Sequence, residues 1–167
     1  MTTTTRRVFH LVSFITLAAC SLTAAEPLLT VTCEQNRKEL GAEDLAKLPA
    51  VEIEALDHGE PHRYRGVAVR DVLALAGAPF GQHAPRGSAM ALAVRVRAAD
   101  GYVAAFGLAE FDPGFRENDI LLVDQQDGKP LPEEAGPLRF VCPGDERGAR
   151  WVRQIVSIEI ISLAAKP

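Results

Sequence analysis

Short apolar segments separated by glycine-containing turns constrain the fold of this chain more than any other feature. From Leu92 to Arg97, apolar residues alternate with arginines, which is the period-two pattern of a half-buried strand. The Asp-Gly pair at 100–101 follows directly, and Asp-Gly is a strong signal for a tight hairpin turn. The segment 102–106 is therefore expected to be the returning strand, and Asp-Gly at 127–128 predicts a second turn of this kind.

Similar segments recur along the whole chain. The expected strands cover 28–33, 51–56, 92–96, 102–106, 120–123, 138–142 and 156–163, with an extended stretch at 62–65. Brief helical segments are expected at 41–48 and 108–111. No internal repeat, low-complexity tract or domain linker interrupts them. The sequence predicts a single α+β domain dominated by strands.

One longer helix is expected after residue 68. Val69, Val72, Leu73 and Ala76 fall at positions i, i+3, i+4 and i+7, which places them on one face of a helix. Gly77 stands where a C-terminal cap belongs. The pattern predicts an amphipathic helix.

Composition and charge exclude some classes of function. The chain has 167 residues, of which 47% are hydrophobic and 24% charged, as in a folded globular protein. Its formal net charge is −4, and removal of Arg6 and Arg7 with a leader takes away two positive charges and leaves −6. An acidic chain without a basic run is a poor candidate for binding nucleic acid.

Residues 1–25 have the pattern of an export signal, which leaves 26–167 as the domain. Arg6 and Arg7 precede an apolar run that ends at Cys20, and small residues continue to Ala25. The run is too short to span a membrane. The paired arginines resemble a twin-arginine signal, while Leu17–Cys20 resembles a lipobox that would leave Cys20 acylated as a membrane anchor. Either route predicts a periplasmic protein of a bacterium.

Cleavage after Ala25 would leave two cysteines, Cys33 and Cys142. An even number of cysteines in an oxidising compartment allows one disulfide. The alternative is two separate buried thiols, because a free cysteine packs like a small hydrophobic residue. The sequence leaves both open.

The stretch 136–155 holds the first candidate site. Arg147, Arg150 and Arg153 are three residues apart and would share one side of a helical turn, beside Trp151, the only tryptophan. With Arg139 on the preceding strand, four guanidinium groups could line a pocket for a small anion. The alternative is an ordinary solvated face.

Other candidate residues carry weaker signals. His58, His62 and His83 could supply a metal site, although polar loop residues are the simpler interpretation. The acidic residues between Glu110 and Asp119 are expected to lie in solvated loops. No nucleophile elbow, phosphate loop, dinucleotide fingerprint or haem-attachment motif is present.

Several segments together resemble the sulfite oxidase-type molybdopterin-binding domain. Residues 64–77 resemble its "GV-x-L-x-DLL-x-x-AG" segment. Further segments resemble "DGY" at 100–102, "LA…-dG-x-PL" at 121–131, "GP-x-R-x-V-x-PG" at 136–144 and "GAR-x-VK" at 148–153. They occur in the family's order over about residues 28–163.

This resemblance implies a strand-rich α+β unit around a pterin-molybdenum cofactor. It implies that Arg139, Arg150 and Arg153 hold the cofactor phosphate, with Trp151 as a wall of the pocket. Catalytic members bind molybdenum through a cysteine thiolate in the segment before "GV-x-L". The corresponding segment here, 55–62, contains no cysteine, and His58 stands near the ligand position. Imidazole and soft thiolate set different electronics at a metal.

Two main hypotheses of function follow. The first is an exported molybdopterin-binding-fold protein with oxidoreductase activity and an arginine-lined site for the cofactor phosphate. The second is a non-catalytic periplasmic binding module that keeps the fold without the cofactor and binds a small anion or a protein partner. A third is a structural lipoprotein anchored through Cys20. Whether the chain is an enzyme stays open at this point.

Overall fold

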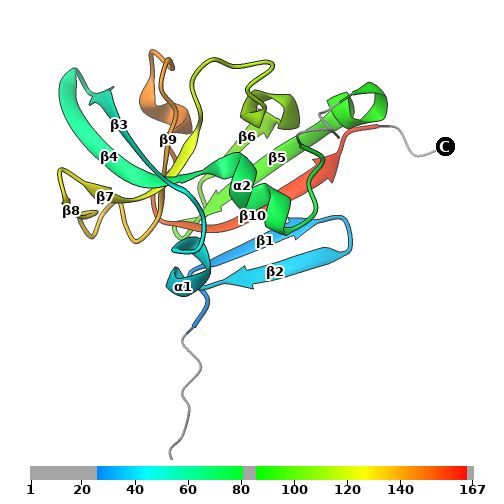
Figure 1. Ribbon diagram of the computed structural model, residues 1–167, viewed down its shortest axis with the longest axis horizontal. Coiled ribbons are helices and arrows are strands. Elements are labelled where there is room, and N and C mark those ends of the chain that lie inside the picture. The colour runs from blue at the N-terminus through cyan, green and yellow to red at the C-terminus, as the bar shows by residue number, and fades with distance from the viewer. Residues whose placement is uncertain (1–25, 81–85, 165–167) are drawn as a thin grey trace, which may run out of the picture.

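Two five-stranded sheets form the body of the protein (Figure 1). The computed structural model describes residues 26–80 and 86–164. The expected leader and His83 therefore lie outside the described residues. Strands dominate, the helices are short, and the chain forms one strand-rich α+β domain, as the sequence predicts.

Sheet A has the order β2-β1-β10-β5-β6. Its strands are β1 (Leu29–Cys33), β2 (Asn36–Leu40), β5 (Leu92–Ala98), β6 (Val103–Gly107) and β10 (Ile155–Ser162). The first and last strands of the chain, β1 and β10, pair in parallel at the centre, and the other pairs are antiparallel. The two ends of the described chain are thereby held together in one sheet.

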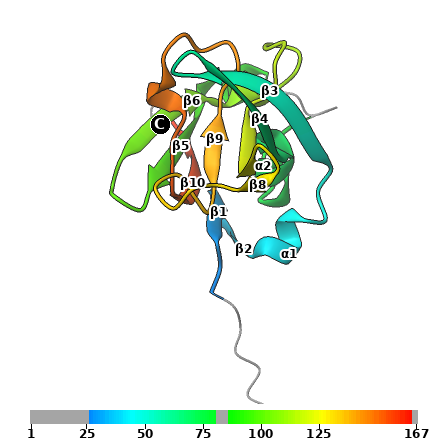
Figure 2. The same ribbon diagram turned by 90° about the vertical axis from the view of Figure 1, so that its left-hand side faces the viewer.

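Sheet B has the order β3-β4-β7-β8, and β9 also pairs with β7. Strand β9 pairs with residues 121–123 of β7, and β8 pairs with residues 125–126. Its strands are β3 (Ala50–Asp57), β4 (Glu60–Ala68), β7 (Leu121–Gln126), β8 (Lys129–Pro130) and β9 (Arg139–Val141). Figure 2 shows β9 in the middle of the molecule, with β5 and β10 on one side and β4 and β8 on the other. A residue on β9 can therefore reach both sheets.

A β-bulge on β7 fixes the register between β4 and β7. Arg65 pairs with Gln125 and Gly66 pairs with Val123, so Asp124 is the extra residue on β7. A Cβ atom at Gly66 would lie 2.1 Å from the Leu122 carbonyl oxygen, which only glycine avoids. The glycine allows the two backbones to approach closely at the bulge.

The longer expected helix is present as α2 (Val69–Leu75), which follows β4 without a loop. Val69, Val72 and Leu73 are buried, and Gly77 adopts a φ of +91° just beyond the helix end, as the pattern predicts. The helix expected at 41–48 is a single turn, α1 (Ala42–Leu45), capped by a hydrogen bond from the Gly41 N–H to Asp44 Oδ2 at 3.1 Å.

In residues 26–80 and 86–164, three 3₁₀ turns complete the secondary structure: η2 (Gly87–Ala91), η3 (Leu108–Phe111) and η4 (Gly148–Arg150). In the described residues, no helix is long and apolar enough to cross a membrane. The core draws buried side chains from both sheets and from α2. Phe106, Phe111 and Phe140 stack edge to face within it, with ring centroids 5.4–6.4 Å apart.

Candidate functional site

Arg139 is the most deeply buried charged residue near the expected site, and its guanidinium is enclosed by protein groups. Its side chain is 8% exposed, and Nη2 donates to Asp57 Oδ2 at 2.8 Å. The guanidinium carbon lies 5.3 Å from the Trp151 ring centroid and 5.6 Å from that of Tyr64. We call these four residues, Asp57, Tyr64, Arg139 and Trp151, the Arg139 cage.

The cage ties the tip of the β3–β4 hairpin to β9. Burial acts to raise the pKa of Asp57, but the hydrogen bond and charge of Arg139 outweigh it and lower that pKa below its usual range. Burial also raises the pKa of Tyr64 to about 12, and its hydroxyl donates to Asp57 at 3.3 Å. Within the described part of the chain, Arg139 Nε is the buried side-chain polar atom left without a hydrogen-bond partner.

Arg150 lies in a second set of ion pairs, with partners 5 and 40 positions away in the sequence. Its Nε and Nη2 donate to both oxygens of Asp145 at 2.9 and 2.8 Å, and Nη1 donates to Glu110 Oε2 at 2.6 Å. Arg116 also lies 3.4 Å from Asp145 and 3.9 Å from Glu110. We call these four residues the arginine network.

The arginine network leaves Arg150 little capacity for another anion. The fork of the guanidinium faces Asp145 in the bidentate geometry that a phosphate would otherwise take. The hydrogen bond from Arg150, opposed by burial, lowers the pKa of Asp145, and the two carboxylates in turn raise the pKa of Arg150. Acidic loop residues expected to be solvated, Glu110 among them, are thus partners of arginine.

The prediction that Arg147, Arg150 and Arg153 share a helical turn is wrong. Only Arg150 belongs to η4, since Arg147 precedes it with extended backbone angles. The chain leaves the helical region at Trp151 (φ −79°, ψ 63°), whose indole N–H donates to the Cys142 carbonyl at 3.1 Å. Arg147 and Arg153 are exposed, and neither has an ion-pair partner among the described residues.

Both cysteines are free and buried, so the alternative of two separate thiols holds and the disulfide does not form. Burial, with the charge of Asp145 adding to it, raises the pKa of Cys142 to about 12. Burial and Glu34 raise the pKa of Cys33. Both side chains belong to the hydrophobic core.

His58 and His62 have different surroundings and different partners. His58 occupies the turn of the β3–β4 hairpin with a φ of 52°, and its side chain is 93% exposed, 3.7 Å from Asp57. His62 Nδ1 lies 2.8 Å from Asp127 Oδ2, next to the second Asp-Gly turn. The described residues contain no group of three or more His, Cys, Asp or Glu placed to hold a metal ion.

These donors do not fit a pterin-molybdenum group. A molybdenum ligand of the thiolate kind is lacking in the described chain, since both thiols are buried. The segment 55–62 places Asp57 in an ion pair with Arg139 and His58 in solvent. Carboxylates of the same chain bind Arg139 and Arg150, although the Arg150 side chain is 34% exposed, and Arg153 is the expected phosphate ligand without such a partner among the described residues. Whether these residues touch a cofactor stays a prediction.

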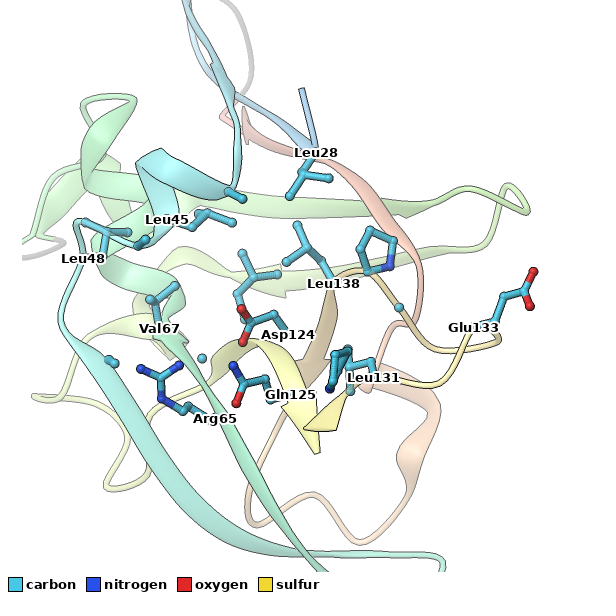
Figure 3. A pocket seen from close by; sticks show the side chains of 18 residues that line it. Leu28, Leu45, Leu48, Arg65, Val67, Asp124, Gln125, Leu131, Glu133 and Leu138 are labelled. Carbon is cyan, nitrogen blue, oxygen red and sulfur yellow. The ribbon is translucent and has the colours of Figure 1, made fainter. Parts of the chain in front are cut away.

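Sequence reasoning missed a cavity of about 590 Å³ between α1 and sheet B (Figure 3). Its wall comes from α1, β4, β7 and the segment 130–138, with Leu28 at one edge. The expected short helix at 41–48 contributes Leu45 and Leu48 to the wall, but its sequence pattern predicted no cavity. The other walls are distant in sequence.

Comparison with known proteins shows which fold this chain shares. A family model described as "Oxidoreductase molybdopterin binding domain" matches residues 11–166. No curated protein matches the chain. Among solved structures, the sulfane dehydrogenase SoxCD from Paracoccus pantotrophus is similar, with a TM-score of 0.60 and 20% sequence identity over 79% of this chain. The match covers 37% of the SoxCD chain, so this chain spans well under half of that structure.

Proposed function

The chain belongs to the oxidoreductase molybdopterin binding domain family, and from that premise we propose that it is a non-catalytic binding module. It keeps the fold of a molybdopterin-binding, oxidoreductase-like domain, as its similarity to SoxCD indicates. In this proposal it holds no molybdenum and acts in the bacterial periplasm. Of the second hypothesis the proposal keeps the protein partner as the ligand and not the small anion, because carboxylates of the same chain occupy Arg139 and Arg150.

This proposal rests on one observation: carboxylates of the protein itself bind the arginines that were expected to bind the cofactor phosphate. Asp57 binds Arg139, and Asp145 with Glu110 binds Arg150, at hydrogen-bond distances of 2.6–2.9 Å. A cofactor phosphate would have to displace these carboxylates and leave them unpaired beside it. In the largely buried pair of Asp57 and Arg139, leaving a charge without its partner costs about 3–5 kcal/mol, which a phosphate contact would have to offset. The pair of Glu110 and Arg150 is about a third exposed and costs less to break.

The competing proposal is an oxidoreductase whose cofactor phosphate lies on Arg139, Arg150 and Arg153. Family membership supports it, and Arg153 is exposed on the surface. The chemistry of the metal ligands speaks against it, because soft thiolate is the ligand that this family uses and the two thiols here are buried.

Elemental analysis of molybdenum separates the two proposals. The protein is purified from the periplasm of its native cells, or from cells competent to make the cofactor, and assayed for molybdenum and for pterin fluorescence. A binding module contains neither in stoichiometric amount. One molybdenum and one pterin per chain would refute the proposal and make His58 the first residue to substitute.

Export is part of the same proposal and has its own measurement. Intact mass and N-terminal sequencing of the native protein give the mature start. A chain that begins at Glu26 supports a cleaved leader, and one that begins at an acylated Cys20 supports the lipoprotein. A chain that retains Arg6 and Arg7 in the cytoplasmic fraction would contradict export.

A further inference from the structure

The cavity between α1 and sheet B has the size and chemistry of a ligand site that the proposed function does not use. Its volume of about 590 Å³ lies within the range of small-molecule pockets, roughly 300–1,000 Å³. It shares no residue with the Arg139 cage or the arginine network. Whatever it binds is therefore independent of the question of the cofactor.

The wall of this cavity is aliphatic. The apolar side chains that Figure 3 labels around it are Leu28, Leu45, Leu48, Val67, Leu131 and Leu138. No aromatic residue contributes to the lining. Flat heterocycles are usually held by stacking on aromatic rings, which this wall cannot offer. An alkyl or acyl chain needs only dispersion contacts and exclusion of water, and leucine supplies both.

Part of the wall is open to solvent without a ligand. Leu28, Leu45 and Leu48 pack against the core but are only partly buried. Each square ångström of apolar surface that a ligand covers contributes about 25 cal/mol. The cavity thus provides a driving force for an apolar body, and α1 with Leu28 forms its outer edge.

Polar groups gather on one side of the cavity. Figure 3 shows Arg65, Asp124 and Gln125 together there, whereas the Glu133 carboxylate at the mouth points away. Asp124 is the extra residue of the β-bulge, which turns its side chain out of the normal alternation. Neither Arg65 nor Asp124 has an ion-pair partner within 4.0 Å in the described chain, although the neighbouring Arg63 pairs with Glu52 at 3.3 Å.

The charges at this polar side cancel. Arg65 supplies one positive charge and donors only, and Asp124 supplies one negative charge and acceptors only. A head group that both accepts and donates hydrogen bonds satisfies the two residues at once. An anionic head would lie beside Asp124, and a cationic head beside Arg65, so each would meet an unfavourable like charge.

We propose that this cavity binds a neutral aliphatic amphiphile. The alkyl or acyl chain lies in the leucine-lined space, and a head group bearing hydroxyl or amide groups accepts from Arg65 and donates to Asp124. The inference goes beyond the proposed function and stands or falls without it.

Three probes with the same chain length and different head groups test the proposal. Monodecanoylglycerol, decanoate and decylamine are titrated below their micelle concentrations into the purified protein, whose molybdenum content has been measured, with isothermal calorimetry as the readout. We expect the neutral probe to bind at least about tenfold more tightly than either charged one. Equal affinities, tighter binding of a charged probe, or no binding of any probe would overturn the inference.

Two substitutions at the polar side sharpen the test. Asp124→Asn removes the negative charge and is expected to raise decanoate affinity about tenfold, while Arg65→Gln does the same for decylamine. Both residues are exposed, so neither variant should fail to fold. Arg63→Gln is the matched control, since Arg63 lies on the same strand outside the cavity and should leave all three affinities unchanged. Selectivity that does not respond to either cavity variant would place the probes elsewhere.

Discussion

The arginine network and the leucine-lined cavity differ in whether their charged groups already have partners within the protein. In the network, every donor group of Arg150 faces a carboxylate of the same chain. In the cavity, Arg65 and Asp124 have no ion-pair partner among the described residues, and three leucines at the edge are half-exposed. A cluster of arginines is thus a poor guide to a binding site unless the partners of each guanidinium are known.

The largest change in stability is expected at the Arg139 cage. Asp57→Ala leaves the Arg139 guanidinium buried without its carboxylate, so we expect the free energy of unfolding to fall by about 3–5 kcal/mol. Urea denaturation measures the change. Glu52→Ala is the control, because its pair with Arg63 is exposed and should change stability by no more than about 0.5 kcal/mol. Similar losses in both variants would mean that the cage does not fix the hairpin.

Acid should weaken the two arginine-bound regions. The pKa values of Asp57 and Asp145 are lowered in the folded state, so the folded protein binds fewer protons than the unfolded chain in acid. Their stabilisation is complete above the unfolded pKa of about 3.9 and is lost as pH falls through the lowered folded values. Urea midpoints between pH 7 and pH 3 should fall in the wild type. The decline should be shallower in Asp57→Asn, and equal slopes would contradict this account.

Freeing Arg150 should create the anion site that the native chain lacks. Asp145→Asn removes the bidentate partner, so inorganic phosphate is expected to stabilise the variant by about 1.4 kcal/mol at ten times its Kd. Thermal unfolding with and without phosphate gives the shift. Wild-type protein should show none beyond that of an equal ionic strength of chloride. A wild type that responds as strongly as the variant would show that its arginines are open to anions.

The cavity wall should show the smallest effect on stability and a clear effect on ligand affinity. Leu45 is half-exposed on α1, so Leu45→Ala should lower the free energy of unfolding by about 1 kcal/mol or less. Affinity for monodecanoylglycerol should nevertheless fall, because the probe loses an aliphatic contact. Leu75→Ala on α2 is the control, since that exposed leucine lies outside the cavity. An unchanged affinity in Leu45→Ala would remove α1 from the site.

Most of the fold could be predicted from local sequence patterns. The alternation in β5, the Asp-Gly turns and the capped helix α2 depend on neighbouring residues, and each was found where expected. Strand β2 was missed because its first four residues, 36–39, are polar and exposed, so only pairing with β1 makes them a strand. The resemblance to the family was confirmed over nearly the whole domain.

The candidate site was predicted only in part, because its partners are distant in sequence. Arg139 and Trp151 were named and do lie together, but Asp57 is 82 positions from Arg139 and could not be assigned to it. The three arginines do not share a helical face because the turn covers only Gly148–Arg150, with extended backbone at Arg147 and non-helical angles at Trp151. The cavity combines α1, β4, β7 and 130–138, and no single segment shows it.

The Arg139 cage also gives the protein an internal optical reporter. Trp151 is the sole tryptophan of the chain, is 6% exposed, and its ring lies against the guanidinium of Arg139. Its fluorescence therefore comes from one defined place, the contact between the β3–β4 hairpin and β9. Emission should be blue-shifted when the hairpin is docked and should move to the red when it opens. Docking of this hairpin can thus be followed without any label, separately from the circular dichroism of the two sheets.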